Sequence, residues 1–549
     1  MKKPLKIFLG DLTYDTVTLA TEAFPLNVAY IASYCKQQFG DSVEITIFKY
    51  IPNLEKALRE SPPDVLGLSN YCWSHNVSKE MFKILSKIKP ESLKVWGGPN
   101  FPVDLPSQEK FMKKHKEIDV YIPIDGETGF SNLIEKILQA DSLKEFSEKL
   151  LDDPIEGCIA RNRDDKLQFS IPTIRIKNLD EIPSPYTSGL LDKFFDGKLT
   201  PMIQTNRGCP FHCTFCTDGK DEVNQVNNFS IDRVRSEINY IVKKVPKNTR
   251  SLHISDLNFG MYARDQQICE ELANAQEKYD YPKFIKCTTG KNQREKIIKA
   301  IRKLSDSLRI TMSVQSLDKQ VLTNIRRSNI SVEQVLDLYP SIKETGLQTT
   351  SEVILGLPGE SYQTHLDTLR GLVHGKMDEI VVHTCMLLDG SEMKTPTEMK
   401  KWDFKTKFRV IQRDFAKLSN GKNVVEIEED LPNVRYLINN RMLFSDIDDT
   451  LEPEVLDKQF SSQDQFTTCL KQIYDELSVR KEFRKIPLWE KRIRYSLLLF
   501  RSFVGGGQYE HIPILIDNLN RGKVQNWFNF LSQGMRKYSS YNPLRAMEL

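Results

Sequence analysis

Three closely spaced cysteines carry the clearest chemical signal in the sequence. The segment TNRGCPFHCTFCTDG holds Cys209, Cys213 and Cys216 in a Cys-x3-Cys-x2-Cys arrangement, in a loop shaped by Gly208 and Pro210. Three thiolates are enough to hold three irons of a 4Fe–4S cubane. Because no fourth cysteine is nearby, one iron of such a cluster would stay open, like the open position of a catalytic zinc site. An open iron is able to bind and reduce a ligand directly.

A zinc site and a chance grouping of thiols are the alternatives. Structural zinc sites normally close with a fourth Cys or His. His212 lies inside the loop, but next to Cys213 it is badly placed to complete a tetrahedron. The other seven cysteines are far apart in a long chain, which favours buried thiols over disulfides; they are Cys35, Cys72, Cys158, Cys269, Cys287, Cys385 and Cys469.

Strands and helices alternate around the cysteine loop. The apolar segments TPMIQTN, SLHISD, FIKCTT, RITMSVQ, SEVILGL and EIVVHTC are predicted strands between 198 and 395, and DRVRSEINYIVKKV is one of the helices between them. Six such units are typical of a partial (β/α) barrel, in which the active site gathers at the carboxyl ends of the strands. The cysteine loop follows the first predicted strand.

The loop resembles the signature of the radical S-adenosylmethionine (SAM) superfamily, with Phe215 as the aromatic residue before the third cysteine. In that family the open iron binds the amino and carboxylate groups of SAM. One electron then cleaves SAM to methionine and a deoxyadenosyl radical, which abstracts hydrogen from the substrate. The resemblance implies a 4Fe–4S cluster, SAM and an electron donor such as flavodoxin or ferredoxin.

Three later segments resemble the SAM-binding segments of the same family, strand by strand. They are SDLNFG, SVQSLDKQVLTNIRR and EVILGLPGES. An arginine suits the carboxylate of SAM because a guanidinium makes paired, charge-assisted hydrogen bonds. The SAM-binding residues that the resemblance implies are Phe215, Asp256, Asn258, Gln315, Ser316, Arg327, Glu352 and Gly356, with Gly359 in the last segment.

Residues 1–140 also alternate strands and helices, from KIFLG to VYIPIDGETGF, which predicts a doubly wound parallel sheet of the Rossmann type. Ligands of such sheets bind at the carboxyl ends of the strands, where Asp11 lies. Glycines at these ends either admit a bulky ligand or simply make tight turns; a Gly–Glu turn is expected at 126–127.

This first region resembles the cobalamin-binding domain that precedes the barrel in one branch of the superfamily, the class B methylases. The resemblance implies cobalamin contacts at Ser69, Tyr71, Trp73, Gly97, Gly98, Pro99, Gly126 and Glu127. Proteins with an axial histidine carry Asp-x-His-x-x-Gly after the first strand, whereas this chain reads DLTYDTVTLATEA and its first histidine is His75. We therefore expect cobalamin without a histidine ligand, or a domain that has kept its shape and lost the cofactor.

The remaining chain carries less chemical information. Residues 141–197 are predicted to form a connector with a hairpin that turns at NRDDK, and 396–549 a helix-rich region of unknown role with VVEIEED as a strand. The chain has 549 residues, 77 Lys and Arg against 74 Asp and Glu, and a net charge of +3. This balance gives no basic field for nucleic acid. Without an apolar membrane span or a signal peptide, we expect a cytoplasmic protein.

Together these features predict a cobalamin-dependent methyltransferase that acts on an unactivated carbon of a small metabolite or natural-product intermediate. The alternative is a radical SAM enzyme of the same architecture that performs a cyclisation, rearrangement or oxidation without methyl transfer. A non-enzymatic corrinoid carrier or sensor is a third possibility. A tRNA methylthiotransferase fits less well, because three further cysteines for a second cluster lack their motif context.

Overall fold

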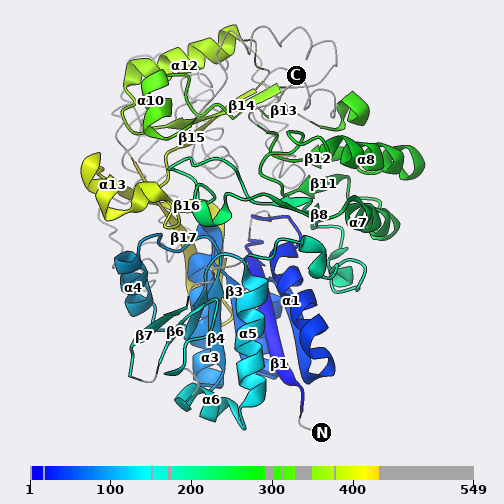
Figure 1. Cartoon of the computed structure of the whole chain (residues 1–549), viewed down its shortest axis with the longest axis vertical. Helices are drawn as coiled ribbons and strands as arrows, with labels where there is room; N and C mark the ends of the chain where they lie inside the picture. Colours follow the sequence, from blue (N-terminus) through cyan, green and yellow to red (C-terminus); the bar gives the residue numbers. More distant parts are fainter. Residues whose placement is uncertain are drawn as a thin grey trace, which may run out of the picture. The chain divides into compact units, whose positions relative to one another are not determined.

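The computed structural model describes residues 3–16, 19–149, 152–162, 164–170, 175–290, 302–308, 310–311, 313–327, 349–375, 377 and 379–431. The chain divides into two compact units (Figure 1). Unit 1 comprises residues 1–12 and 22–404, and unit 2 comprises residues 13–21 and 405–549. Both the predicted sheet and the predicted barrel lie in unit 1.

The first part of unit 1 is a seven-stranded sheet with the order β2-β1-β3-β4-β5-β6-β7. Strands β1, β3, β4 and β5 are parallel neighbours, as the alternation of strands and helices predicts. Valine, isoleucine and leucine dominate them because both faces of such a sheet are covered. The strands are β1 (Leu5–Thr13), β2 (Val43–Tyr50), β3 (Val65–Ser69), β4 (Leu93–Gly97), β5 (Val120–Ile122), β6 (Cys158–Arg161) and β7 (Leu167–Ser170).

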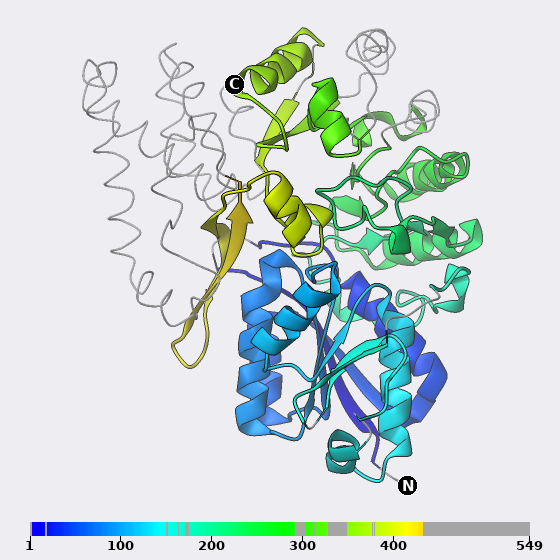
Figure 2. The same cartoon turned by 60° about the vertical axis from the view of Figure 1, so that its left-hand side comes forward.

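Helices cover both faces of this sheet, which is the doubly wound arrangement that we expected. Figure 2 shows α1 beside α5 on one side of the strands and the α2–α3 pair on the other. Trp96, Phe82 and Phe130 are among the large side chains that fill the core. The helices are α1 (Leu26–Phe39), α2 (Ile51–Glu60), α3 (His75–Ile88), α4 (Leu105–Lys114), α5 (Gly126–Gln139) and α6 (Leu143–Lys149).

Two details of this region differ from the sequence-based expectation. Gly126 and Glu127 form the first turn of α5 instead of a separate Gly–Glu turn. The hairpin expected in the connector does form, as β6 and β7, but β6 also pairs antiparallel with β5. The hairpin therefore extends the N-terminal sheet, because the edge of β5 is otherwise left with unpaired backbone groups.

The barrel strands follow in the predicted order. One sheet has the order β12-β11-β8 and the other β13-β14-β15, with parallel pairing in both. A parallel bridge between Ile285 and Leu308 connects them. The six strands are β8 (Met202–Ile203), β11 (Ser251–Ile254), β12 (Phe284–Lys286), β13 (Ile310–Thr311), β14 (Thr349–Leu355) and β15 (Glu379–Thr384), and a separate antiparallel pair is formed by β9 (Asn206–Arg207) and β10 (Asn227–Asn228). Six parallel segments in sequence order make the partial (β/α) barrel that was predicted.

Local capping signals explain where several barrel helices begin. The Ser230 hydroxyl accepts a hydrogen bond from the Arg233 N–H at the start of α7, and Ser361 with Thr364 forms a capping box at α12. The described helices are α7 (Ile231–Lys244), α8 (Asp265–Tyr279), α10 (Lys319–Asn324), α12 (Tyr362–His374) and α13 (Pro396–Lys401). No described helix combines the length and the apolar character that crossing a membrane requires.

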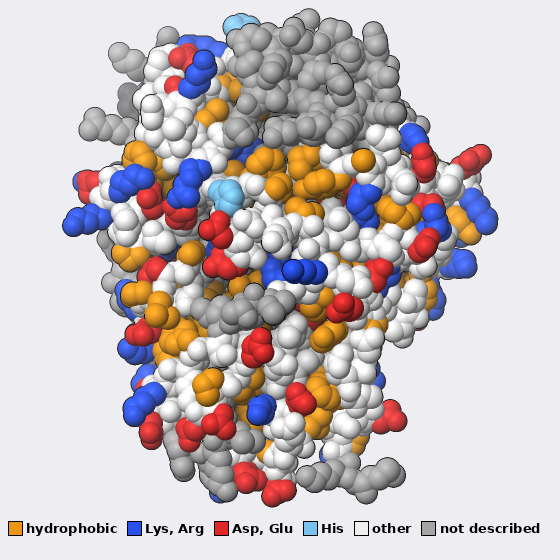
Figure 3. All heavy atoms as spheres, in the orientation of Figure 1, with side chains coloured by type: hydrophobic (Ala, Val, Ile, Leu, Met, Phe, Trp, Pro, Cys, Tyr) orange, Lys and Arg blue, Asp and Glu red, His pale blue; other side chains and the backbone are white. Residues whose placement is uncertain are grey.

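Unit 2 contains an antiparallel hairpin of β16 (Lys407–Lys417) and β17 (Asn423–Asp430), which confirms the strand expected at VVEIEED. Within this unit the hydroxyl of Tyr14 donates a 2.6 Å hydrogen bond to the buried carboxylate of Glu426. The helices expected between 432 and 549 lie outside the described residues. On the face drawn in Figure 3, described acidic and basic side chains are interspersed.

Candidate cluster and cofactor sites

The cysteine loop begins directly after β9. Cys209 and Cys213 are buried and form no disulfide, and Cys216 is partly exposed. The Cys209 N–H donates to the carbonyl of Val223, and the Cys216 N–H to that of Cys213. Glycine is required at 219, where a Cβ atom would lie 2.2 Å from the Cys213 carbonyl oxygen. These contacts fold the loop tightly around its three sulfurs.

Two predicted SAM-site residues contact the cysteine sulfurs. The Asn258 side-chain amide donates to the Sγ of Cys209 at 3.4 Å, and the guanidinium of Arg327 lies 3.8 Å from the Sγ of Cys213. Burial lowers the pKa of Arg327, and the negative charge of the neighbouring cysteines opposes that shift. Arg327 also donates to the carbonyl of Ser313. Donors aimed at thiolate sulfurs are a feature of iron–sulfur sites, where they tune the reduction potential.

The same place holds buried polar atoms without hydrogen-bond partners. They are the side-chain oxygens of Asn258 and Gln315, the hydroxyl of Thr214 and the hydroxyl of Tyr262. Gln315 has a positive φ of 65°, an unusual conformation for a residue other than glycine, and its backbone bridges to β14. Buried acceptors normally find partners, so this set fits a polar ligand such as the amino group of SAM.

The type and number of donors in the loop match those of an iron–sulfur cluster. Among the residues that the structure describes, no three His, Cys, Asp or Glu side chains converge as ligands of one metal ion. In a cubane, each of the three thiolates binds a different iron. That the three cysteines hold a cluster with an open iron stays a prediction, with which the sulfur-directed donors and the unpartnered oxygens of Asn258 and Gln315 are compatible.

Asp256 points at the chain segment that leads into the cysteine loop. Its carboxylate accepts hydrogen bonds from the backbone of Thr205 at 2.7 Å and from the side chain of Asn206 at 2.8 Å. It also accepts from the Thr205 hydroxyl and the Asn206 N–H. Burial raises the pKa of Asp256 to about 7. In this structure Asp256 therefore holds the start of the loop, and a direct contact with SAM stays a prediction.

The other predicted SAM residues lie on or next to the later barrel strands. Glu352 on β14 lies 3.9 Å from His383 of β15 and accepts a hydrogen bond from Ser313. Both neighbours, His383 most, lower the pKa of Glu352. The Ser316 hydroxyl accepts the N–H of Asp318 before α10. The remaining two differ in setting: Gly356, after β14, has φ 90°, and Phe215 is half-buried in the cysteine loop.

Polar side chains also meet at the carboxyl ends of the N-terminal strands. The buried Lys49 ammonium lies 2.8 Å from the Asp11 carboxylate, and the Ser69 hydroxyl donates to the same carboxylate at 2.6 Å. These three residues lie within the last three positions of β1, β2 and β3, which are neighbours in the sheet. Because each charge is matched, the group is a rigid polar base at the edge where ligands of this fold bind.

Backbone crowding shapes the next part of the edge. A Cβ atom on Gly98, whose φ is 131°, would lie 2.7 Å from the carbonyl oxygen of Asn70, and one on Gly97 would lie 3.0 Å from the Ile122 carbonyl. Pro99 follows, with its carbonyl close to Gly390 of the barrel part. The glycines of WGGPN are therefore needed for the close approach of two strand ends, whatever ligand binds there.

Two aromatic rings stand at the same edge. Tyr71 and Trp73 stack with ring centroids 4.6 Å apart and planes within 7°, and Trp73 is 37% exposed. The hydroxyl of Tyr71 accepts a 3.4 Å hydrogen bond from Asn27. The exposed ring of Trp73, stacked on the less exposed ring of Tyr71, could offer a flat apolar surface to a large planar ligand.

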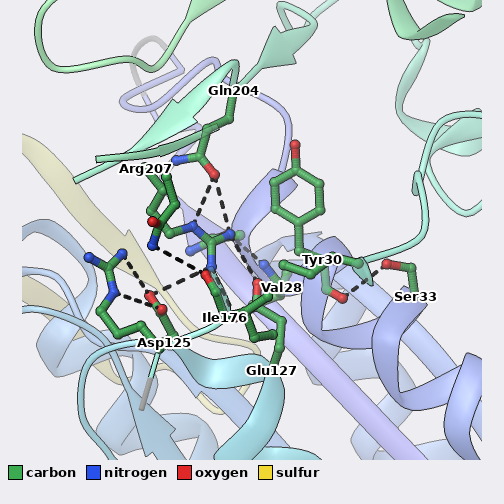
Figure 4. Close-up of polar contacts among 12 residues, drawn as sticks. Val28, Tyr30, Ser33, Asp125, Glu127, Ile176, Gln204 and Arg207 are labelled. Carbon is green, nitrogen blue, oxygen red and sulfur yellow. Dashed lines mark hydrogen bonds and ion pairs between the residues drawn. The ribbon is translucent and has the colours of Figure 1, made fainter. Parts of the chain in front are cut away.

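Glu127, a predicted cobalamin contact, bonds through its carboxylate to the barrel part, and a contact with cobalamin stays a prediction. Its carboxylate accepts hydrogen bonds from both terminal nitrogens of Arg207, at 3.0 and 3.1 Å (Figure 4). Asp125 lies 3.6 Å from the same guanidinium and pairs with Arg175 at 2.9 Å. Sequence reasoning did not select Arg207 or Arg175. The available signal was the arginine that stands two positions before the first cluster cysteine.

Two family profiles match the chain. The radical SAM superfamily profile matches residues 203–372, and the B12-binding domain profile matches residues 13–134. The first range contains the cysteine loop and all the predicted SAM residues. The second contains the strand ends with the predicted cobalamin residues.

Two curated relatives with similar sequences are methyltransferases by name. The chain is 28% identical over 415 residues to a 2-(S-pantetheinyl)-carbapenam-3-carboxylate methyltransferase of Streptantibioticus cattleyicolor, covering 72% of this chain and 58% of the relative. It is 28% identical over 374 residues to the cobalamin-dependent radical SAM methyltransferase TokK of Streptomyces tokunonensis, covering 66% and 52%. The chain thus spans little more than half the length of these relatives.

Solved structures share the fold. The radical SAM methyltransferase TsrM of Kitasatospora setae, with cobalamin and a 4Fe–4S cluster bound, has a TM-score of 0.56 at 12% identity, covering 79% of this chain and 89% of TsrM. The cobalamin-dependent SAM radical enzyme OxsB also has a TM-score of 0.56, at 15% identity, covering 96% of this chain and 78% of OxsB. The chain therefore carries a B12-binding domain, matched over residues 13–134, followed by a radical SAM domain, matched over residues 203–372.

Proposed function

We propose that this protein is a cobalamin-dependent radical SAM methyltransferase whose substrate is a small natural-product intermediate. The observation that carries the proposal is the cysteine loop, in which buried thiols, sulfur-directed donors and unpartnered acceptors occur together. The names of the relatives supply the methyl transfer and the substrate class.

Each part of the chain has a defined task in this proposal. When bound, the cluster and the corrinoid supply one-electron and methyl-transfer chemistry, and the protein supplies binding, orientation and the exclusion of water. Cys209, Cys213 and Cys216 would hold the cluster. Asn258 and Gln315 would receive polar groups of SAM, because their side-chain oxygens are buried without partners.

We further propose that cobalamin binds without a histidine below the cobalt. The first histidine of the sequence is His75, at the start of α3. Its Nδ1 lies 3.0 Å from the Asn70 side-chain oxygen, and its ring packs 4.6 Å from that of Trp96. Burial also lowers the pKa of His75 well below its usual value. The His75 side chain is therefore held by contacts that stabilise the end of the strand, and these contacts do not favour its use as a cobalt ligand.

The test of function uses anaerobically reconstituted protein with cobalamin, a strong chemical reductant and methyl-labelled SAM. Candidate substrates are thioether-bearing bicyclic carboxylates and other small acids. We expect deoxyadenosine, S-adenosylhomocysteine and labelled product to form together, and a flavodoxin or ferredoxin to replace the chemical reductant. Deoxyadenosine without any labelled product or S-adenosylhomocysteine would contradict methyl transfer.

One observation favours a second candidate, a radical cyclase or oxidase of the same architecture. The anaerobic magnesium-protoporphyrin IX monomethyl ester cyclase of Cereibacter sphaeroides is 22% identical over 362 residues, covering 63% of this chain and 56% of the cyclase. This candidate predicts deoxyadenosine and an altered substrate of unchanged carbon count. Mass spectrometry of the product therefore separates the two functions.

A further inference from the structure

Four charged side chains join the B12-binding part of unit 1 to the cysteine loop. Asp125 directly precedes α5 and Glu127 lies in the first turn of that helix, whereas Arg175 lies in the connector and Arg207 ends β9. Two carboxylates face two guanidinium groups, so the formal charges of this set cancel. The set is defined here as the Arg207 cluster.

The main ion pair of the Arg207 cluster is largely shielded from solvent. The side chain of Glu127 is 3% exposed and that of Arg207 is 15% exposed. Burial acts to lower the pKa of Arg207, but the carboxylates of Glu127 and Asp125 outweigh it, so that the pKa lies above its ordinary value. Gln204 also accepts from the guanidinium, and the ring of Tyr30 lies beside it at 5.7 Å (Figure 4). A two-pronged pair in such surroundings holds one orientation.

The Arg207 cluster lies next to the backbone that leads into the first cysteine. Gly208, with φ 116°, separates Arg207 from Cys209, and a Cβ atom there would lie 2.1 Å from the Gln225 carbonyl oxygen. Arg175 donates to the same Gln225 carbonyl at 3.3 Å. Both chain segments that bracket the cysteine loop are therefore tied to Asp125 and Glu127 of the N-terminal sheet.

We propose that Arg207 is a positioning residue that fixes the cysteine loop relative to the corrinoid-binding edge, so that radical formation and methyl transfer stay coupled. This inference rests on the proposed function. It assigns to Glu127 a structural task at the junction of the two domains in place of a cobalamin contact. Displacements of about 1 Å are enough to cost roughly a hundredfold in rate when two reacting groups must be aligned.

The experiment compares wild type with Arg207→Met and with the double variant Arg207→Met/Glu127→Gln. The double variant avoids an unpaired buried carboxylate, which by itself would destabilise the fold. We expect both variants to retain iron and to form deoxyadenosine within about twofold of wild type. The ratio of methylated product to deoxyadenosine should fall at least about tenfold. Arg207→Lys, which keeps the charge but not the two-pronged geometry, should restore part of the ratio.

A readout that does not depend on turnover accompanies the ratio. The magnetic interaction between cob(II)alamin and the reduced cluster, measured by electron paramagnetic resonance (EPR), should weaken or broaden in the variants. Arg235→Met is the matched control, because Arg235 pairs with Glu271 between α7 and α8, away from the junction. This control should leave both readouts unchanged.

The outcomes separate the inference from the function on which it rests. An unchanged product ratio and an unchanged EPR interaction in the double variant would overturn the inference and leave the methyltransferase proposal intact. Loss of iron in both variants would also overturn the inference. The Arg207 cluster would then be needed only for the cysteine loop to fold and hold iron. A wild type that binds no corrinoid and makes no methylated product would overturn the function, and the inference with it.

Discussion

The two ligand-facing edges of unit 1 are built on different principles. At the N-terminal sheet, the polar side chains bond one another, as Asp11 does with Lys49 and Ser69, and two glycines bring backbone segments together. At the barrel, Asn258 and Gln315 keep buried oxygens without partners. From this comparison we expect shape to select the ligand at the first edge and convergent polar groups to select it at the second.

Removal of the cluster ligands is the strongest test of the barrel edge. We expect the triple variant Cys209→Ala/Cys213→Ala/Cys216→Ala to lose its iron and all deoxyadenosine formation, because no thiolate is left to hold the cubane. Iron analysis, the absorption spectrum and product chromatography measure this. Cys269→Ala, a buried cysteine on α8, is the control and should retain all three signals. Deoxyadenosine production by the triple variant would refute the cluster assignment.

A glycine substitution tests whether shape governs the N-terminal edge. Gly98→Ala should abolish tight corrinoid binding while deoxyadenosine formation persists, because its Cβ would lie 2.7 Å from the Asn70 carbonyl oxygen. Corrinoid retained after gel filtration is the measurement. Gly40→Ala is matched in having a positive φ of 51° with open space around it, so it reports backbone strain alone. Equal corrinoid retention in the two variants would contradict the role of close backbone approach.

The unpartnered acceptor of Gln315 predicts a graded effect at the barrel edge. Gln315→Met should weaken SAM binding by about 1–3 kcal/mol, or roughly 5- to 150-fold, because the ligand loses a buried hydrogen bond. The ligand-free variant should be at least as stable as wild type, since a buried atom without a partner is removed. Anaerobic equilibrium dialysis and thermal unfolding provide the two numbers. Unchanged SAM affinity would mean that this oxygen faces no part of SAM.

A prediction on stability instead of ligand binding concerns pH and Asp256. Burial raises its pKa to about 7, so between about pH 4 and 7 the folded protein keeps a proton that the unfolded chain releases. The contribution of Asp256 to stability should therefore fall as pH rises through this window, by at most about 1.4 kcal/mol per pH unit. Asp256→Asn should remove this slope in thermal unfolding between pH 5 and 8. A slope that persists in the variant would assign it to other groups, such as Asp265.

Much of the fold and of the barrel site could be predicted from local patterns. Apolar strands alternating with helices give the doubly wound sheet and the barrel order, since each element must bury one face. The spacing of Cys209, Cys213 and Cys216 predicts the loop, because ligands of one cluster lie close in sequence. The β16–β17 hairpin was anticipated only in its second strand.

Contacts between distant segments could not be predicted in this way. The pairing of β6 with β5 depends on which sheet edge is free, which strand patterns do not encode. Glu127 looked like a ligand-contacting residue from its motif, yet its carboxylate is bound by Arg207, eighty positions later. Similarly, Asp256 is turned toward Thr205 and Asn206.

The sequence by itself determined the order of the elements, the thiolate loop and the absence of a histidine after the first strand, because each depends on residue type and short spacing. Tertiary structure decided which of the candidate polar groups are free for a ligand and which are occupied by the protein. The physical reason is that a buried carboxylate or amide takes whatever partner the folded chain brings within about 3 Å, and that partner can come from anywhere in the sequence.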